Sequence, residues 1–246
     1  MKTNGYILSA AALIVVVYLI YFLQFYVVLD YEVSDDAAVW GQLGDYVGGV
    51  LNPFFGFVTL VLLIKSLSLQ NEANRSLRAE LKNTEKTEKL RSFEVLFFSL
   101  INAQKNLFES FSLDFSEGGE LIRLSGAEAV MKVEADVEEA RKSGVDNEKI
   151  REYLDDIDKN DQMFGLFRSF YVIVKIIYER LSESEGFSSL ERKVHFLSLV
   201  NLTEFSQLRM YMMYIQFMDY DSCEYMRTSL EFRNTVEEVG LGYELY

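Results

Sequence analysis

The sequence predicts an all-α protein, with an N-terminal two-helix transmembrane hairpin followed by a cytoplasmic helical domain. Two stretches near the N-terminus carry almost no charge, a short acidic segment separates them, and the remainder has apolar residues at helical spacing and no proline. The one proline of the chain, Pro53, falls within the second stretch. We expect three parts: a transmembrane hairpin at 1–65, a polar juxtamembrane helix at 66–92 and a cytoplasmic helical domain at 93–246.

The two uncharged stretches are long enough to cross a bilayer. The first contains the 27 residues from Thr3 to Leu29, and the second contains the 19 residues from Tyr46 to Ile64. A hydrocarbon core of ~30 Å requires roughly 20 apolar helical residues, so we expect spans at about 6–29 and 41–64. The first stretch is too long for the apolar region of a cleaved signal peptide, which is the alternative interpretation.

Basic residues predict the topology of the two spans. The link from Asp30 to Asp36 holds four acidic residues and no Lys or Arg, whereas seven basic residues lie between Lys65 and Arg91. Because basic residues are enriched in cytoplasmic segments, we expect a multi-pass protein whose two termini both face the cytoplasm.

The charge of the chain restricts its partners. The net charge is −14, of which −10 belongs to residues 65–246. Binding to nucleic acid relies on neutralising phosphates, so we expect no direct nucleic-acid binding. The single cysteine, Cys223, cannot form an internal disulfide, which fits a reducing compartment.

The first part of the remaining sequence predicts a polar helix followed by a buried one. Residues 66–92 hold few leucines and no sustained apolar heptad, which favours a solvated helix over a coiled coil. Residues 93–111 place Phe and Leu near helical spacing and predict a buried helix. Gly118 and Gly119 interrupt the pattern, and the segment 127–142 predicts a charged helix.

The C-terminal part predicts further core helices. Asp146 is placed to cap a short helix. Residues 163–181 are strongly apolar but contain charged side chains, which favours a core helix over a third span. Residues 187–218 predict a long helix or a helical pair that ends in RMYMMYIQFM. Such a Met- and Tyr-rich segment is either core or an adaptable docking surface.

We expect no catalytic, cofactor or metal site, so the protein is not predicted to be an enzyme. The single histidine, His195, lies in an apolar stretch typical of a core or helix-face position. One His and one Cys cannot supply a zinc cluster. No phosphate-binding loop or dinucleotide fingerprint occurs in the sequence.

The second span has features that a simple anchor does not need. The residues proposed as a helix-packing and activation face are Gly44, Asp45, Gly48, Asn52, Pro53 and Gly56. Positions four apart share one side of a helix, and glycines there permit close approach of another backbone. The proline removes a backbone donor and predicts a kink.

Two interpretations of this face remain open at this point. The glycines serve either to pack the second span against the first, or to drive oligomerisation or a pore-like rearrangement. Asp45 is expected near the outer interface, about 30 Å along the helix from Lys65. A role in lining a water path would require Asp45 to lie deeper in the bilayer.

The block G-x-x-G-D-x-x-G-G-x-x-N-P, from Gly41 to Pro53, resembles the phage abortive-infection proteins of the AbiC-like family. The resemblance extends to Gln70, to the Phe-rich segment at 93–104 and to the aromatic segment at 167–179. The Phe-rich helix of that family often carries a histidine, but this chain has none there, so no role of that histidine is carried over. The size and the two spans also resemble the transmembrane effector encoded beside some retron reverse transcriptases.

These resemblances imply a toxic effector of bacterial anti-phage defence that kills the infected cell at its inner membrane. The implied partners are the lipid bilayer, further copies of the chain and, as an inhibitory partner, a reverse transcriptase with its RNA–DNA product. The alternative is a membrane-anchored sensor or scaffold whose cytoplasmic domain binds a partner.

Overall fold

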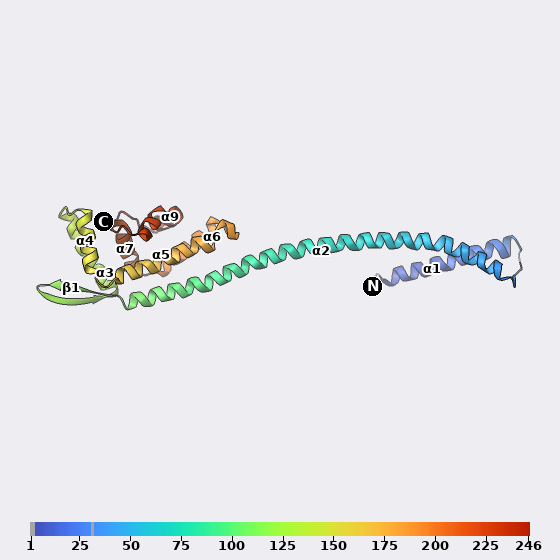
Figure 1. Cartoon of the computed structure of the whole chain (residues 1–246), viewed down its shortest axis with the longest axis horizontal. Helices are drawn as coiled ribbons and strands as arrows, with labels where there is room; N and C mark the ends of the chain where they lie inside the picture. Colours follow the sequence, from blue (N-terminus) through green and yellow to red (C-terminus); the bar gives the residue numbers. More distant parts are fainter. Residues whose placement is uncertain (1–2, 31) are drawn as a thin grey trace. The chain divides into compact units, whose positions relative to one another are not determined.

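The computed structural model describes residues 3–30 and 32–246, and these residues are mostly helical (Figure 1). Residues 1, 2 and 31 of the predicted hairpin lie outside the described residues. The α-helices are α1 (Thr3–Phe22), α2 (Ala37–Glu109), α3 (Gly126–Lys142), α4 (Asn147–Ile157), α5 (Gln162–Arg180), α6 (Ser189–Leu202), α7 (Phe205–Phe217), α8 (Asp221–Thr228) and α9 (Leu230–Glu238). The other elements are the π-helix η1 (Leu23–Val28), the 3-10 helix η2 (Glu183–Glu185) and the strands β1 (Ser112–Glu117) and β2 (Glu120–Ser125).

The chain divides into two compact units, Met1–Leu81 and Lys82–Tyr246. Helix α2 contributes residues to both units. Its segment 66–92, expected as a polar helix, is helical throughout and largely exposed. The division falls within this segment.

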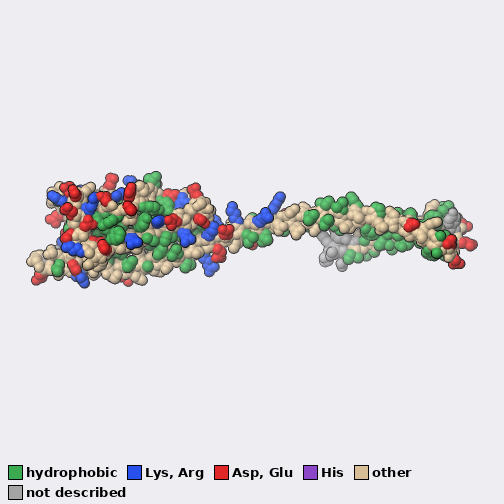
Figure 2. All heavy atoms as spheres, in the orientation of Figure 1, with side chains coloured by type: hydrophobic (Ala, Val, Ile, Leu, Met, Phe, Trp, Pro, Cys, Tyr) green, Lys and Arg blue, Asp and Glu red, His purple; other side chains and the backbone are tan. Residues whose placement is uncertain are grey.

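The first unit holds the two apolar helices. By length and composition, both the segment Ile7–Val28 and helix α2 are able to cross a membrane. The Asp36 carboxylate accepts a hydrogen bond from the Ala38 amide at 2.9 Å and so caps the start of α2. Hydrophobic side chains cover much of the surface of this unit (Figure 2), and Val17 and Leu51 are its buried hydrophobic side chains among those described.

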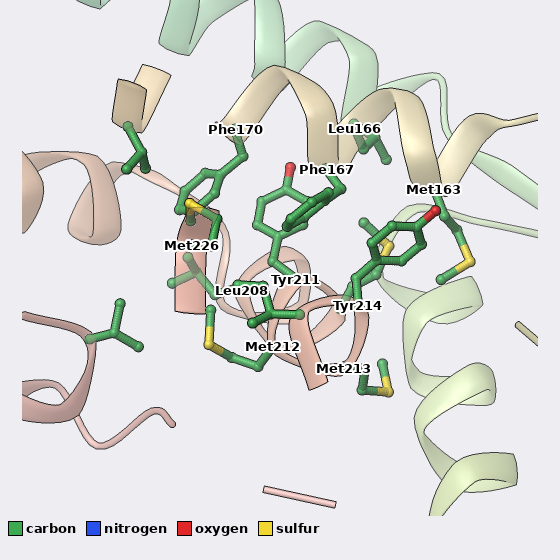
Figure 3. Packing of buried hydrophobic residues seen from close by; sticks show 14 of the residues in the cluster. Met163, Leu166, Phe167, Phe170, Leu208, Tyr211, Met212, Met213, Tyr214 and Met226 are labelled. Atoms are coloured by element: carbon green, nitrogen blue, oxygen red, sulfur yellow. The ribbon is translucent and has the colours of Figure 1, made fainter. Parts of the chain in front are cut away.

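The second unit has a dense hydrophobic core. Helices α5 and α7 supply large side chains to its centre, where Phe167 and Phe170 from α5 lie against Tyr211 from α7 (Figure 3). The Phe170 and Tyr211 rings are 4.6 Å apart. The segment predicted at 163–181 is therefore a core helix, as expected.

The pair of helices predicted within 187–218 is confirmed by α6 and α7. The methionines and tyrosines of α7 are buried: Met210, Tyr211, Met212, Met213 and Tyr214. This segment is consequently part of the core, and the alternative of a docking surface does not hold.

A β-hairpin follows α2, and the sequence analysis did not predict it. Strands β1 and β2 pair antiparallel from Ser112 with Ser125 to Glu117 with Glu120. Gly118 and Gly119 form the turn with φ angles of +60° and +88°, which suits glycine in a tight hairpin turn. The sequence pattern alone predicts only a helix break at these glycines. They also reverse the chain, while Leu113 and Phe115 enter the core.

Local hydrogen bonds define the helix starts in the second unit. The Asp146 carboxylate accepts from the Lys149 amide at 3.0 Å, which confirms the predicted cap of α4. Ser188 and Glu191 form a reciprocal capping box at the start of α6. The charged helix predicted at 127–142 corresponds to α3.

Candidate functional site

The six residues proposed for the packing face all lie on α2 within the first unit. Successive helical residues are rotated by about 100°, so Asp45, Asn52 and Gly56 fall within a sector of roughly 40°. The opposite side of the helix carries Val47, which is half-buried, and Leu51, which is buried. Asp45, Asn52 and Gly56 therefore face away from the more buried side of α2, whereas Gly44 and Gly48 lie nearer to that side.

The glycines of this face do not serve the close approach of α1. A Cβ atom placed on Gly44 or Gly56 would meet no described heavy atom within 4 Å. On Gly48 it would meet only the amide nitrogen of Asn52, at 3.6 Å and on the same helix. No described atom of α1 therefore lies within 4 Å of a Cβ on these glycines, and the space beside Gly44 and Gly56 is open.

Contact between the two helices of the first unit relies on larger side chains instead. The rings of Tyr21, from α1, and Tyr46, from α2, are 5.4 Å apart. Val17 and Leu51 are buried on the same two helices. Pro53 lies inside α2, which continues in helical conformation on both sides of it.

The single histidine and the single cysteine of the sequence both lie in the second unit, where they pack against neighbouring side chains. His195 packs edge-on against Phe93, with ring centroids 5.0 Å apart, and its Nδ1 lies 2.8 Å from the Glu191 carbonyl oxygen. Cys223 is fully buried, and this burial raises the pKa of its thiol to about 11. A thiol held protonated in this way is a poor nucleophile.

Metal ligands do not cluster in the described part of the chain. Over residues 3–30 and 32–246, no three or more His, Cys, Asp or Glu side chains form a group that could hold an ion.

A buried group of amides and a phenol joins α2 to α7. The Tyr211 hydroxyl accepts hydrogen bonds from Gln207 Nε2 at 2.6 Å and from Gln104 Nε2 at 3.3 Å. All three side chains are almost completely buried, and burial raises the pKa of Tyr211, which keeps its phenol neutral. The sequence carries one signal for this group, since Gln104 follows Phe97 and Ile101 along the buried side of α2.

Comparison of the chain with known proteins gave no match to a family model, to a curated protein or to a solved structure.

Proposed function

We propose that the chain is a membrane-embedded toxic effector of bacterial anti-phage defence, which permeabilises or depolarises the inner membrane when infection releases it. Its two apolar helices form a transmembrane hairpin, and the link between them faces outward. Both termini face the cytoplasm, in accord with the basic residues that follow the second span. The resemblance to the abortive-infection and retron-associated proteins supplies the defence role.

The observation that carries this proposal is the open face of α2 that bears Asp45, Asn52 and Gly56. In a bilayer, packing and interhelical hydrogen bonds drive helix association, because lipid is as apolar as the side chains. Small residues allow a second backbone to approach, and Asn52 offers an amide for a hydrogen bond across the contact. This face therefore supports assembly of several copies of the hairpin.

Control of the toxin requires an inhibitory partner. The retron resemblance suggests a reverse transcriptase with its RNA–DNA product in this role, bound to the cytoplasmic unit. That unit is acidic, so its contact would be with the protein component and not with the nucleic-acid backbone.

The proposal is tested by filling the open face. Gly56→Leu places a bulky, membrane-compatible side chain where another helix would approach. After induction in bacteria, the wild-type chain should cause dye entry and loss of membrane potential, and Gly56→Leu should abolish both at an unchanged level of membrane-inserted protein.

Gly5→Leu is the matched control, because a Cβ on Gly5 also meets no described heavy atom within 4 Å but lies on α1. It should retain toxicity. If Gly56→Leu is as toxic as the wild-type chain, the face does not mediate assembly. An intact membrane after induction of the wild-type chain would favour the sensor or scaffold alternative.

A further inference from the structure

Helix α2 carries a continuous polar stripe along the part that is proposed to cross the membrane. At about 100° per residue, a set of exposed residues spaced alternately three and four apart falls within a sector of roughly 100°: Gln42, Asp45, Gly49, Asn52, Gly56 and Thr59. Between positions 41 and 59, no apolar side chain lies in this sector. The buried Leu51 and the exposed Phe54 and Phe57 lie on other sides of the helix.

The polarity of this stripe does not suit contact with lipid. Hydrocarbon offers no partner for a hydrogen bond, and ionisable side chains in membrane spans face other protein or a water-filled cavity. Asp45, Asn52 and Thr59 are exposed, whereas Leu51 marks a different side of α2 as the one that packs within the unit. The stripe therefore requires water or further protein to cover it.

The backbone adds an acceptor to the same stripe. Pro53 has no N–H group, so the Gly49 carbonyl oxygen lacks the amide partner that an uninterrupted helix supplies four residues later. Gly49 has no side chain that could shield this oxygen, and a Cβ placed on it would meet no described heavy atom within 4 Å. Backbone groups without a helical partner are tolerated at membrane depth where protein covers them or where they line a water-filled cavity.

One end of the stripe is acidic. Residues 30–45 contain five acidic and no basic side chains. Helix α2 begins at Ala37, so Asp45 lies at the same end of the helix as the acidic link. Surfaces that carry one sign of charge concentrate the opposite ion, and this end consequently attracts cations and repels anions.

We propose that several copies of the chain turn this stripe toward one another and enclose a water-filled path that conducts cations in preference to anions. Asn52, Thr59 and the Gly49 carbonyl oxygen line the path. The expected position of Asp45 near the outer interface suits an entrance, where its carboxylate attracts the cation. This inference rests on the proposed permeabilisation of the membrane and adds the ion that passes.

The chemistry of the stripe favours further copies of this chain as its neighbours. An amide both donates and accepts hydrogen bonds, so the Asn52 side chains of two copies are able to pair with each other. The Asp45 carboxylates of the same copies would repel one another in a dry contact, because like charges brought together disfavour the charged form. Water and a cation between the Asp45 side chains remove this conflict.

Currents through planar lipid bilayers that contain the purified full chain test the proposal, with a gradient of KCl across the bilayer. The voltage at which the current reverses should show a preference for K⁺ over Cl⁻ of about fivefold. Asp45→Asn should remove most of this preference because it removes the negative charge at the entrance. Asp45→Glu, which retains the charge, should keep the preference.

A second variant tests the lining of the path. Asn52→Leu should lower the current about tenfold, since an apolar constriction resists wetting. Phe54→Leu is the matched control at an exposed position outside the stripe, and it should change neither current nor selectivity. Glu80→Gln, on an exposed part of α2 beyond the spans, is the control for charge and should keep the preference for K⁺.

The possible outcomes separate this inference from the proposed function. A current without preference for K⁺, a preference that persists in Asp45→Asn, or a full current through Asn52→Leu would overturn the cation path and leave permeabilisation intact. Loss of current in both Asp45 variants would also overturn it, because the effect would then not depend on charge. A wild-type chain that carries no current would overturn the proposed function itself.

Discussion

The two units of this chain bury their apolar side chains to very different degrees. In the first unit, large hydrophobic residues such as Phe54, Phe57 and Leu60 are exposed. In the second unit, a continuous cluster of hydrophobic side chains is almost completely buried. The same residue types therefore complete a core in one unit, whereas in the other they form a surface that requires a further apolar environment.

Charged residues show the opposite distribution. Residues 1–64 contain one basic and five acidic side chains, whereas charges are spread over the surface of the second unit (Figure 2). Exposed apolar surface of this extent marks a contact with lipid or with another protein. The second unit therefore buries its own apolar side chains, whereas the first unit leaves most of its apolar side chains exposed.

The largest expected effect comes from separating the two units. Residues 82–246, expressed alone, should be soluble, monomeric and helical, because their core is formed within this range. Residues 1–81 should remain insoluble unless detergent or lipid is added. Size-exclusion chromatography and circular dichroism measure both outcomes, and aggregation of the 82–246 fragment in the absence of detergent would refute the comparison.

A smaller effect is expected from removing one phenylalanine ring in each unit. Phe170→Ala should lower the free energy of unfolding by about 3–5 kcal/mol, because the ring is fully buried and contacts Tyr211 and Phe232. Phe57 is 66% exposed, so Phe57→Ala should change that free energy by less than about 0.5 kcal/mol.

Thermal melts of the full chain in detergent, followed by circular dichroism, compare the two alanine variants. An equal loss of stability would show that Phe57 is covered by protein, as in an assembly of several chains. Protein, and not lipid, would then be the environment of the exposed apolar side chains of the first unit.

The sequence was most informative where structure depends on local signals. The core helix predicted at 163–181 is α5, and the cap at Asp146 needs only the amide of Lys149 three residues later. Both signals are contained within one or two helical turns. The Gly118–Gly119 turn is also a local signal. However, apolar and polar residues alternate only briefly around Leu113 and Phe115, and so short a pattern does not by itself distinguish a strand from the end of a helix.

The buried group of Gln104, Gln207 and Tyr211 could not be predicted because its members are distant in sequence. Gln104 and Tyr211 are separated by 107 positions and meet only when α7 packs against α2.

The glycine-bearing face of α2 could be predicted in part from the sequence. The spacing of Gly44, Gly48, Asn52 and Gly56 predicts a shared side of the helix, but only the structure shows that no described atom of α1 lies within 4 Å of a Cβ placed on these glycines.

The smallest effect concerns an ion pair that links α2 to α6 inside the second unit. Lys86 Nζ lies 2.8 Å from Glu191 Oε1, and Ser188 donates two hydrogen bonds to the same carboxylate. The Lys86 ammonium, together with Ser188, lowers the pKa of Glu191 from 4.5 to about 2. The contribution to stability is therefore complete above pH 4.5, and it is lost as the pH falls towards 2, because the unfolded chain binds the proton first.

Glu191→Gln isolates this contribution, since glutamine also completes a capping box but cannot pair with Lys86 as an anion. The side chains are partly exposed, so the variant should lose less than about 1 kcal/mol of unfolding free energy at pH 7. Urea unfolding at several pH values should show this difference shrinking between pH 4.5 and 2. Glu88→Gln, in the exposed part of α2, should show no such difference. If the effect of Glu191→Gln were the same at every pH, the ion pair would not contribute through its charge, and the link between α2 and α6 would depend on packing alone.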